Sequence, residues 1–441
     1  MKLNPISGFP ERLPEERIYE QEIIEKIKKI YESYAFVPIE TRAIEYLSTL
    51  ASKASDSKEI YSLKRAFAPE EEIEKDAFSL HFDLTVPFAR YVAENLAKLN
   101  FPFRRYQVQK VWRGERPQKG RFREFYQFDI DVIAREELPL SLEAEVLEAY
   151  VKAWGVFDFL NYKIFFNNRK ILLGFYEALG ISEDKRKDVI KAVDKISKIY
   201  EDGVREELIA LNIDSESINK ILEFSKGRFT HSDAIKYLKE KYLKELKITS
   251  KLFTLGIEEM ETIFSLLSDE VLSKIIVDFS LARGLDYYTG SIFEVKLEDR
   301  LEYGALGAGG SYENLCGDFI NKSLPGMGAS IGITRIVSLI IDEGLVSLKK
   351  SLANILIAVY DEAQRKKCNK IANKLRKLGY NTEVFYKSIK IGKQIEYADK
   401  LGIPFILFLD PNDNKTISIK NLKTKEQKVL DNLESLREIC K

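Results

Sequence analysis

The segment of residues 103–133 constrains the fold most, because its side chains alternate with the two-residue period of a β-strand. We predict two strands joined by a loop. Successive strand side chains point to opposite faces, so the second strand has a mostly apolar, buried face and a polar face. The polar face changes from a cation at one end to two carboxylates at the other. The apolar face holds Phe122, Glu124, Tyr126, Phe128, Ile130 and Val132, and the polar face holds Arg123, Phe125, Gln127, Asp129 and Asp131.

The polar face of this hairpin has two interpretations that the pattern leaves open. The first strand adds Gln109 and Arg113, with Glu115 just beyond it, and the loop over residues 115–121 is longer and more basic than a hairpin turn needs. Such a face is suited to a binding floor, with phosphate at its cationic end and an ammonium group at its anionic end. A charged antiparallel hairpin in solvent would carry the same residues.

Composition indicates a folded protein of several domains. A chain of 441 residues predicts about three domains. Its 45% hydrophobic and 31% charged residues are typical of folded soluble proteins. No apolar run reaches the length of a membrane span, and the first residues lack the apolar core of a secretory signal, so we expect a cytoplasmic protein with no membrane partner. Three scattered cysteines and two histidines argue against a zinc site or a histidine-based triad, and we predict no metal ligands.

Charge is distributed unevenly along the chain, although the formal net charge is zero. Residues 349–441 hold 20 Lys and Arg against 11 Asp and Glu, a balance of +9, so the first 348 residues carry −9. A basic terminal domain on an acidic body indicates an anionic partner for that domain. A solvated lysine-rich surface explains the same count, and charge alone does not separate the two interpretations.

A polar pair follows a predicted strand over residues 78–82. Asp83 and Thr85 stand between this strand and a helix that we expect to begin near Pro87, since proline is favoured in a first helical turn. Both side chains are good helix caps, which accounts for one of them. A carboxylate and a hydroxyl at a strand end are equally suited to binding a polar ligand.

Two further arginines lie where a purely structural role is unexpected. Arg283 begins a turn-like segment that contains Tyr287 and Tyr288; one tyrosine is expected in the core, and the arginine and the other tyrosine are candidates to bind a ligand. Arg335 is the lone charge near the start of an apolar helix predicted over residues 333–341. A buried arginine is costly unless it is paired or binds an anion.

The order of predicted elements indicates a mixed α+β core with an antiparallel hairpin, a helical insertion and a C-terminal α/β domain. Helical periodicity dominates from residue 169, and strand-rich sequence resumes after residue 251. From residue 353 strands and helices alternate, with a closing helix expected over residues 427–439. The predicted domains are 1–168, the first part of the core; 169–251, the insertion; 252–348, the second part of the core; and 352–441, the C-terminal domain.

Five segments, in the order that the family has them, resemble the motifs of the histidyl-tRNA synthetases, which are class II aminoacyl-tRNA synthetases. FVPIETRAIE resembles motif 1, WRGERPQKGRFREFYQFDIDV resembles motif 2, and MGASIGITRIV resembles motif 3. LHFDLTVPFARYVA resembles a strand that contacts histidine, and RGLDYYTGSIFEV resembles the family's histidine signature. The C-terminal domain resembles the anticodon-binding domain of several class II enzymes. The resemblance covers nearly the whole chain and implies the class II fold: an α+β catalytic core with an antiparallel sheet, a helical insertion and a C-terminal α/β anticodon-binding-like domain.

The resemblance also implies roles for individual residues. ATP would lie over the antiparallel sheet, with Arg113 and Arg335 on phosphate, Glu115 near the adenine, Arg121 on the terminal phosphates and Phe125 stacked on the adenine. Histidine would be held by Asp83, Thr85, Gln127, Asp131, Tyr287 and Tyr288, with Tyr312 closing the pocket. Arg283 would stabilise charge on the histidine carboxylate and the α-phosphate, so that Arg283 and Arg113 carry the catalysis.

The implied reaction is that of a histidine–tRNA ligase. L-Histidine attacks the α-phosphorus of ATP to give histidyl-adenylate, and the histidyl group then passes to the 3′ end of histidine tRNA. The family implies Mg²⁺ bridging the phosphates. It also implies a homodimer formed through the motif 1 region, tRNA acceptor-end binding by the core and insertion, and anticodon binding by the C-terminal domain. The first step brings two anions together, so fixed positive charge is the main requirement.

Several positions depart from the family pattern. His81 and Ser311 each stand where the family usually has arginine, so each removes a cation near the implied site. The other departures are Arg42 for proline, Thr334 for glutamate, Glu313 for aspartate, and Pro10-Glu11 for an Arg-Asp pair.

Two other functions share this resemblance. One is a non-aminoacylating regulatory paralogue of the histidine biosynthesis pathway, and the other is a non-enzymatic tRNA sensor like the synthetase-like domain of a stress kinase. Regulatory paralogues typically lack the anticodon domain and have a degraded histidine signature, and both features are present in this chain. No kinase domain is attached. We therefore expect an active ligase.

Overall fold

The computed structural model describes residues 4–51, 59–66, 77–283, 288–317, 319–410, 412 and 416–439. The chain divides into two compact units. Residues 1–10 and 23–342 form the larger unit, and residues 11–22 and 343–441 form the smaller one. None of the described helices has the length together with the apolar character that a bilayer crossing needs.

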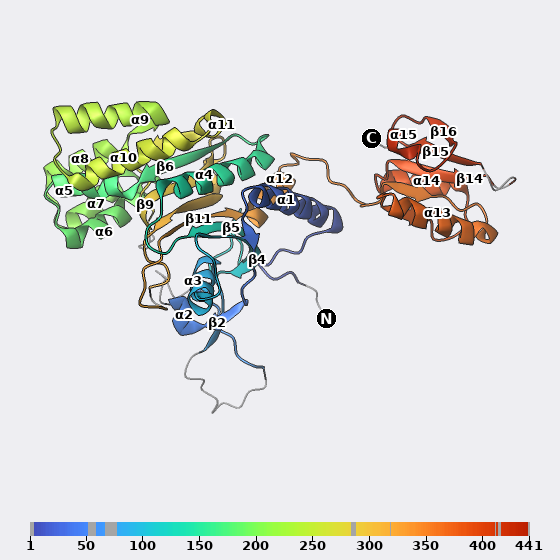
Figure 1. Cartoon of the computed structure of the whole chain (residues 1–441), viewed down its shortest axis with the longest axis horizontal. Coiled ribbons are helices and arrows are strands. Elements are labelled where there is room, and N and C mark those ends of the chain that lie inside the picture. Colours follow the sequence, from blue (N-terminus) through green and yellow to red (C-terminus); the bar gives the residue numbers. More distant parts are fainter. Residues whose placement is uncertain are drawn as a thin grey trace. The chain divides into compact units, whose positions relative to one another are not determined.

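A nine-stranded sheet forms the centre of the larger unit (Figure 1). Its middle strands run antiparallel, whereas β1 with β4 and β6 with β8 run parallel. Across the sheet the strands are β1 (Val37–Pro38), β4 (Phe103–Trp112), β5 (Glu124–Ile133), β11 (Gly326–Gly332), β10 (Gly307–Tyr312), β9 (Tyr288–Leu297), β6 (Tyr162–Asn168), β8 (Ile275–Asp278) and β7 (Arg228–Thr230). The antiparallel core sheet expected from the sequence is confirmed.

Strands β4 and β5 form the predicted hairpin, and their register aligns its polar side chains. Arg105 lies opposite Asp131, and Gln109 lies opposite Gln127. On the other side of β5, strand β11 places Gly328 opposite Asp131. The predicted apolar face is buried at Phe128, Ile130 and Val132, but Gln127, Asp129 and Asp131 are also buried. The interpretation of this hairpin as a charged, solvated surface is therefore wrong.

A small two-stranded sheet leads into the helix that follows Asp83. Strand β2 (Ile44–Tyr46) pairs with β3 (Phe78–Leu80), and α2 (Leu47–Ala51) follows β2. Helix α3 (Thr85–Asn95) begins two residues before Pro87, so the proline occupies the first turn as its missing N–H allows. Asp83 Oδ1 accepts a hydrogen bond from Val86 N at 3.1 Å, which caps this helix.

Helices cover the sheet where its apolar side chains need burial. Helix α4 packs against β5 and β11, and α12 packs against β5. Tyr150, on α4, donates its hydroxyl to Ser330 O at 3.0 Å, so one buried polar group of the helix is satisfied by the sheet itself. These helices, with the N-terminal one and the short 3₁₀ turns beside them, are α1 (Pro14–Ser33), α4 (Leu140–Trp154), η2 (Gly155–Phe157), η4 (Leu301–Tyr303) and α12 (Ile333–Asp342).

The segment predicted as a helical insertion forms a group of helices at the edge of the sheet that carries β6, β8 and β7 (Figure 1). They are α5 (Arg169–Ala178), α6 (Glu183–Asp194), α7 (Ile196–Ala210), α8 (Ser215–Ser225), α9 (His231–Tyr237) and η3 (Leu238–Glu245), followed by α10 (Lys251–Leu266) and α11 (Asp269–Leu272). Helices α5 and α10 cross closely: a Cβ on Gly174 would lie 2.3 Å from Phe253 N. The short β7 also ties this segment to the sheet through β8.

The smaller unit contains a five-stranded sheet whose central strand β14 is buried throughout. Strands β13, β12 and β14 run parallel, and β15 and β16 extend the sheet antiparallel. Its elements are β12 (Ile355–Ile357), η5 (Glu362–Gln364), α13 (Arg365–Lys377), β13 (Thr382–Val384), α14 (Ile391–Lys400), β14 (Phe405–Leu409), β15 (Ile417–Asn421), β16 (Gln427–Leu430) and α15 (Leu436–Ile439). The expected closing helix is wrong in its first part, because residues 427–430 pair with β15 instead.

Candidate active site

A cavity of about 530 Å³ lies over the polar face of the hairpin. Strands β5, β11, β10 and β9 supply much of its lining, and the loop after β4 and the segment before α3 supply further parts. Twelve of the thirteen predicted site residues line it: Asp83, Thr85, Arg113, Glu115, Arg121, Phe125, Gln127, Asp131, Arg283, Tyr288, Tyr312 and Arg335. Tyr287 lies outside the described residues. The structure therefore brings together side chains that are distant in the sequence.

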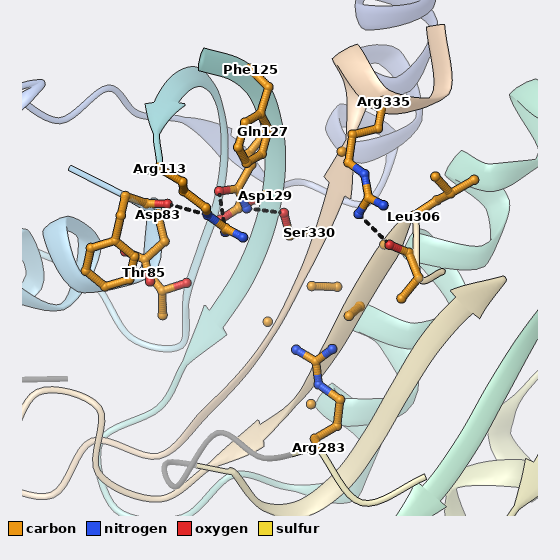
Figure 2. Close-up of a pocket in the computed structure, with 18 of the residues that line it drawn as sticks. Asp83, Thr85, Arg113, Phe125, Gln127, Asp129, Arg283, Leu306, Ser330 and Arg335 are labelled. Carbon is orange, nitrogen blue, oxygen red and sulfur yellow. Dashed lines mark hydrogen bonds between the residues drawn. The ribbon is translucent and has the colours of Figure 1, made fainter. Parts of the chain in front are cut away.

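Three arginines extend toward one space from different sides of this cavity (Figure 2). Arg113 follows β4, Arg283 precedes β9, and Arg335 lies on α12. Three guanidinium groups that converge on one space make a strong site for an anion with several charged oxygens.

Backbone carbonyls hold Arg335 in place. Its Nε, Nη1 and Nη2 each donate a hydrogen bond of 2.6 Å, to Gly120 O, Ala305 O and Tyr303 O respectively. Burial, together with the neighbouring Arg121 and Arg113, lowers its pKa to about 10, so the side chain remains charged at neutral pH. The sequence left open whether this arginine is paired or binds an anion. In the structure it is partly buried, and its fixed geometry serves both roles, because carbonyl oxygens orient the cation without neutralising it.

Arg113 joins the two ends of the cavity. Its Nε donates to Phe82 O at 3.0 Å, and its guanidinium lies 5.2 Å from the centre of the Phe125 ring. A longer contact of 3.5 Å runs from Nη2 to Gln127 Oε1. Glu115 lies 3.8 Å from Arg113 and 3.5 Å from Arg121, and so holds the two cations of this loop near each other.

Arg283 has a backbone conformation that is rare for a residue with a Cβ. Its φ of 51° lies in the left-handed region, which costs about 1 kcal/mol or more for a residue other than glycine. The chain holds it there partly through Arg169, whose Nη1 donates to Arg283 O at 3.2 Å. The guanidinium lies 5.4 Å from the ring centre of Tyr288. Strain of this kind is found where a side chain must be directed into a site.

Carboxylates gather at the other end of the polar face. Asp83, Asp129 and Asp131 all line the cavity. Burial raises the pKa of Asp83 to about 6 and that of Asp131 to about 7, and it also raises the pKa of Asp129. Tyr312 donates its hydroxyl to Asp131 Oδ1 at 3.3 Å. Asp83 both caps α3 and lines the cavity, so the two interpretations of this residue are compatible.

Glycines keep the floor of the cavity open. A Cβ on Gly328 would lie 1.9 Å from Asp131 Oδ1, and a Cβ on Gly310 would lie 2.6 Å from the Tyr288 ring. Both glycines lie in strands, where the missing side chain allows close approach of a neighbouring group. Ser330 closes the floor beside them and accepts a hydrogen bond of 2.7 Å from Gln127 Nε2.

Neither of the two positions that depart from the family's arginines lines the cavity. His81 is fully buried, its Nε2 lies 2.7 Å from Lys110 O, and its ring lies 5.4 Å from that of Trp112. Burial lowers the pKa of His81, so its ring is neutral at neutral pH and does not replace the lost cation. Ser311 is buried on β10, where a Cβ on Gly290 would lie 2.6 Å from its hydroxyl.

Sequence reasoning missed several residues of this site. Glu59 and Lys198 line the cavity, although each comes from a segment with no motif to indicate it. Arg105 lies directly behind Asp131, with its Nη2 2.6 Å from Asp131 Oδ2. The one feature of the sequence that could have identified Arg105 as a site residue is its position on the same strand face as Gln109.

The comparisons with known proteins agree with this geometry. The family model for histidyl-tRNA synthetase matches residues 8–336, and the model for an anticodon-binding domain matches residues 349–441. Histidine–tRNA ligase of Thermobifida fusca is 42% identical and that of Clostridium tetani 37% identical; the alignments cover 96% and 99% of this chain, and 95% and 98% of those proteins. A crystal structure of histidyl-tRNA synthetase from Nostoc sp. PCC 7120 superposes with a TM-score of 0.88 at 35% identity, over 100% of this chain and 99% of that one. A model match over most of the chain and relatives of this identity leave one conclusion: this chain belongs to the histidyl-tRNA synthetase family.

Proposed function

We propose that this cavity activates L-histidine with ATP and that the chain then transfers the histidyl group to the 3′ end of histidine tRNA. One observation carries the proposal: three guanidinium groups converge on a single cavity, and the carboxylates of Asp83, Asp129 and Asp131 line the same cavity on the side of Arg113. Such a cavity fits an amino acid whose carboxylate must meet a phosphate while its cationic groups are held away from that phosphate.

The activation step needs positive charge where two anions meet. The histidine carboxylate attacks the α-phosphorus, the bond to the bridging oxygen breaks, and pyrophosphate leaves. Arg113 and Arg283 would stabilise the charge that develops on the α-phosphate oxygens, from opposite sides of the cavity. Fixed groups supply this stabilisation without reorganising, which is why Arg283 in a strained backbone and Arg113 on a backbone carbonyl suit the task. The step asks for no general base.

The nucleotide would occupy the end of the cavity near the loop after β4. Phe125 would offer its ring to the adenine, and Glu115 would lie close to the base. Arg121 and Arg335 would contact the phosphates. Glu59 and Glu115, the carboxylates that line this part of the cavity within the described segments, would help to hold Mg²⁺, which would supply further positive charge near the phosphates.

Histidine would lie over the carboxylates. Asp83, Thr85 and Gln127 would hold its ammonium group, and Asp131 with Tyr288 would meet the imidazole ring. Tyr312, through its hydrogen bond to Asp131, would close the pocket. We propose the same histidine-binding role for Tyr287. Buried partners of this kind discriminate strongly, because an amino acid lacking the matching N–H leaves them unpaired.

The tRNA would be bound at two places. We propose that the smaller unit binds the anticodon, since it carries the positive balance of the chain and matches an anticodon-binding domain. The core and the helices from α5 to η3 would bind the acceptor end. We further propose a homodimer formed through the motif 1 region around β1, acting in the cytoplasm.

Histidine-dependent exchange of labelled pyrophosphate into ATP tests the activation step, and charging of histidine tRNA tests the transfer. We expect both with the purified full chain and Mg²⁺. An absence of exchange would refute the enzymatic proposal. That absence would favour the regulatory paralogue, an alternative that the full-length similarity to named ligases does not favour. Exchange without charging would refute the transfer step alone.

A further inference from the structure

A fully buried guanidinium lies directly behind the carboxylate end of the cavity. Arg105, on β4, has no exposed surface, and its Nη2 lies 2.6 Å from Asp131 Oδ2 and 4.0 Å from Asp129 Oδ2. Its Nη1 donates to Gln107 Oε1 at 3.3 Å, and its guanidinium carbon lies 4.2 Å from the centre of the Phe88 ring. Burying a cation is costly unless it is paired, so the energetic state of Arg105 depends on Asp131.

The surroundings of Asp131 leave its two oxygens with different partners. Oδ2 is bound by Arg105, which lies directly across the β4–β5 register. Oδ1 accepts the hydroxyl of Tyr312 and lies where a Cβ on Gly328 would be only 1.9 Å away. Tyr312 and Gly328 both line the cavity, so Oδ1 is the oxygen on the ligand's side. The ion pair thus fixes which oxygen a ligand meets.

Arg105 also lowers the pKa of Asp131, which burial and two neighbouring carboxylates raise. Burial raises the pKa of Asp131 to about 7, and the neighbouring Asp129 and Asp83 act in the same direction, whereas Arg105 lowers it. Among the described residues, the other titratable or charged groups near this cluster include Tyr312 from β10 and Arg113 from just after β4, and Tyr31 from α1 and Tyr150 from α4 face Asp129. Without Arg105, the carboxyl group would be buried beside two other carboxylates with no direct ion-pair partner.

We propose that Arg105 is a positioning residue for amino-acid recognition: by binding one oxygen of Asp131, it favours the ionised form of that carboxylate and directs the other oxygen at an N–H of the histidine ring. This proposal rests on the proposed function. The proposal makes Arg105, which does not line the cavity, responsible for a preference of the site. The preferred substrate is one whose ring donates a hydrogen bond. A protonated Asp131 would offer a hydroxyl at the same place and would lose this selectivity.

The test is the pH dependence of amino-acid binding in Arg105→Met, measured by pyrophosphate exchange with the full chain between about pH 6 and 8.5, which brackets the Asp131 titration. The triazole analogue of histidine serves as substrate beside histidine, because its ring keeps an N–H but stays neutral over this range. Its KM therefore reports protonation of the protein rather than of the substrate. Arg104→Met is the matched control: this neighbouring arginine is part-exposed and pairs with Glu145 at 2.6 Å, on the other strand face.

In the unchanged chain, we expect the KM for the analogue to rise as the pH falls through about 7. In Arg105→Met the rise should begin at least about one pH unit higher, which is about a fivefold higher KM at pH 7 and about a tenfold higher KM at lower pH. Arg105→Lys should restore the profile, Arg104→Met should leave it in place, and the KM for ATP should not change. A KM raised equally at all pH values, or raised as much for ATP, would mean a merely structural role and overturn the proposal.

Two further measurements keep the test decisive. If circular dichroism shows that Arg105→Met is unfolded, the pH dependence of the KM is measured with Arg105→Gln instead. If the unchanged chain shows no exchange, the proposed function fails, and calorimetric titration of the same variants with histidine then judges Arg105 independently. A pH shift of the histidine affinity between unchanged chain and variant supports the proposal, and an identical pH profile refutes it.

Discussion

Replacing Gly328 with alanine places a methyl group where the Asp131 carboxylate now lies. The Cβ would be 1.9 Å from Oδ1 and 2.6 Å from the carboxyl carbon. The carboxylate has little freedom to retreat, because Arg105 holds its other oxygen at 2.6 Å and is itself fully buried. Overpacking of a well-packed interior costs about 1–3 kcal/mol. If the Asp131 side chain takes up this strain, histidine affinity should fall about 5- to 150-fold, at about 1.4 kcal/mol per factor of ten.

Pyrophosphate exchange with Gly328→Ala separates this effect from general damage. The KM for histidine should rise by that factor, whereas the KM for ATP should stay nearly constant, because Arg335 is held by carbonyls of other segments. Gly392→Ala on α14 is the control, since nothing lies within 4 Å of the Cβ that it would gain. A change of less than about twofold in the KM for histidine, or an equal rise for both substrates, would refute the placement of histidine over Asp131.

Four further outcomes follow from the contacts. Arg335→Lys should raise the KM for ATP and lower the melting temperature by several degrees, because one ammonium group cannot donate to three separate carbonyls in the guanidinium geometry; exchange kinetics and thermal unfolding check this. Arg283→Ala should lower the exchange rate by at least about a hundredfold while the fold persists, and near-normal exchange would contradict its catalytic role. In the ligand-free chain, the folded state keeps a proton on Asp131 up to about pH 7, whereas the unfolded state releases it near 3.8. This carboxyl group therefore lowers the free energy of unfolding as the pH rises between those values. Asp131→Asn should remove this slope of about 1.4 kcal/mol per pH unit from the free energy of unfolding measured in urea. The pair Lys370→Glu and Lys374→Glu on exposed positions of α13 should weaken tRNA charging and leave exchange intact, and equal losses in both assays would argue against tRNA binding by the smaller unit.

The two faces of the hairpin could be predicted because strand alternation is a local property of the chain. The burial of its polar face could not be predicted from the sequence, because it depends on β11, which follows about 200 residues later and pairs with β5. Arg105 shows the same limit: its face was known from periodicity, but its partner Asp131 follows only from the register of the two strands.

Local signals failed where distant pairing decided the structure. Residues 427–430 fit a helical pattern in sequence, yet they extend the sheet of the smaller unit beside β15. Lys198 reaches the cavity from α7, and no motif surrounds it. By contrast, Arg335 was identified from sequence because an isolated charge in an apolar helix is conspicuous, although the three carbonyls that hold it come from other segments.

Charge within the cavity determines how a bound amino acid can be oriented. At the carboxylate end, Asp83, Asp129 and Asp131 face two guanidinium groups, those of Arg105 and Arg113. When all are ionised, one negative charge remains, and the neutral His81 does not offset it. A cationic group of the substrate supplies the missing charge, and its arrival lowers the pKa values of the carboxyl groups that burial has raised. The carboxylate of the same substrate is then directed toward the arginines at the opposite end, which is the orientation that attack on a phosphate requires.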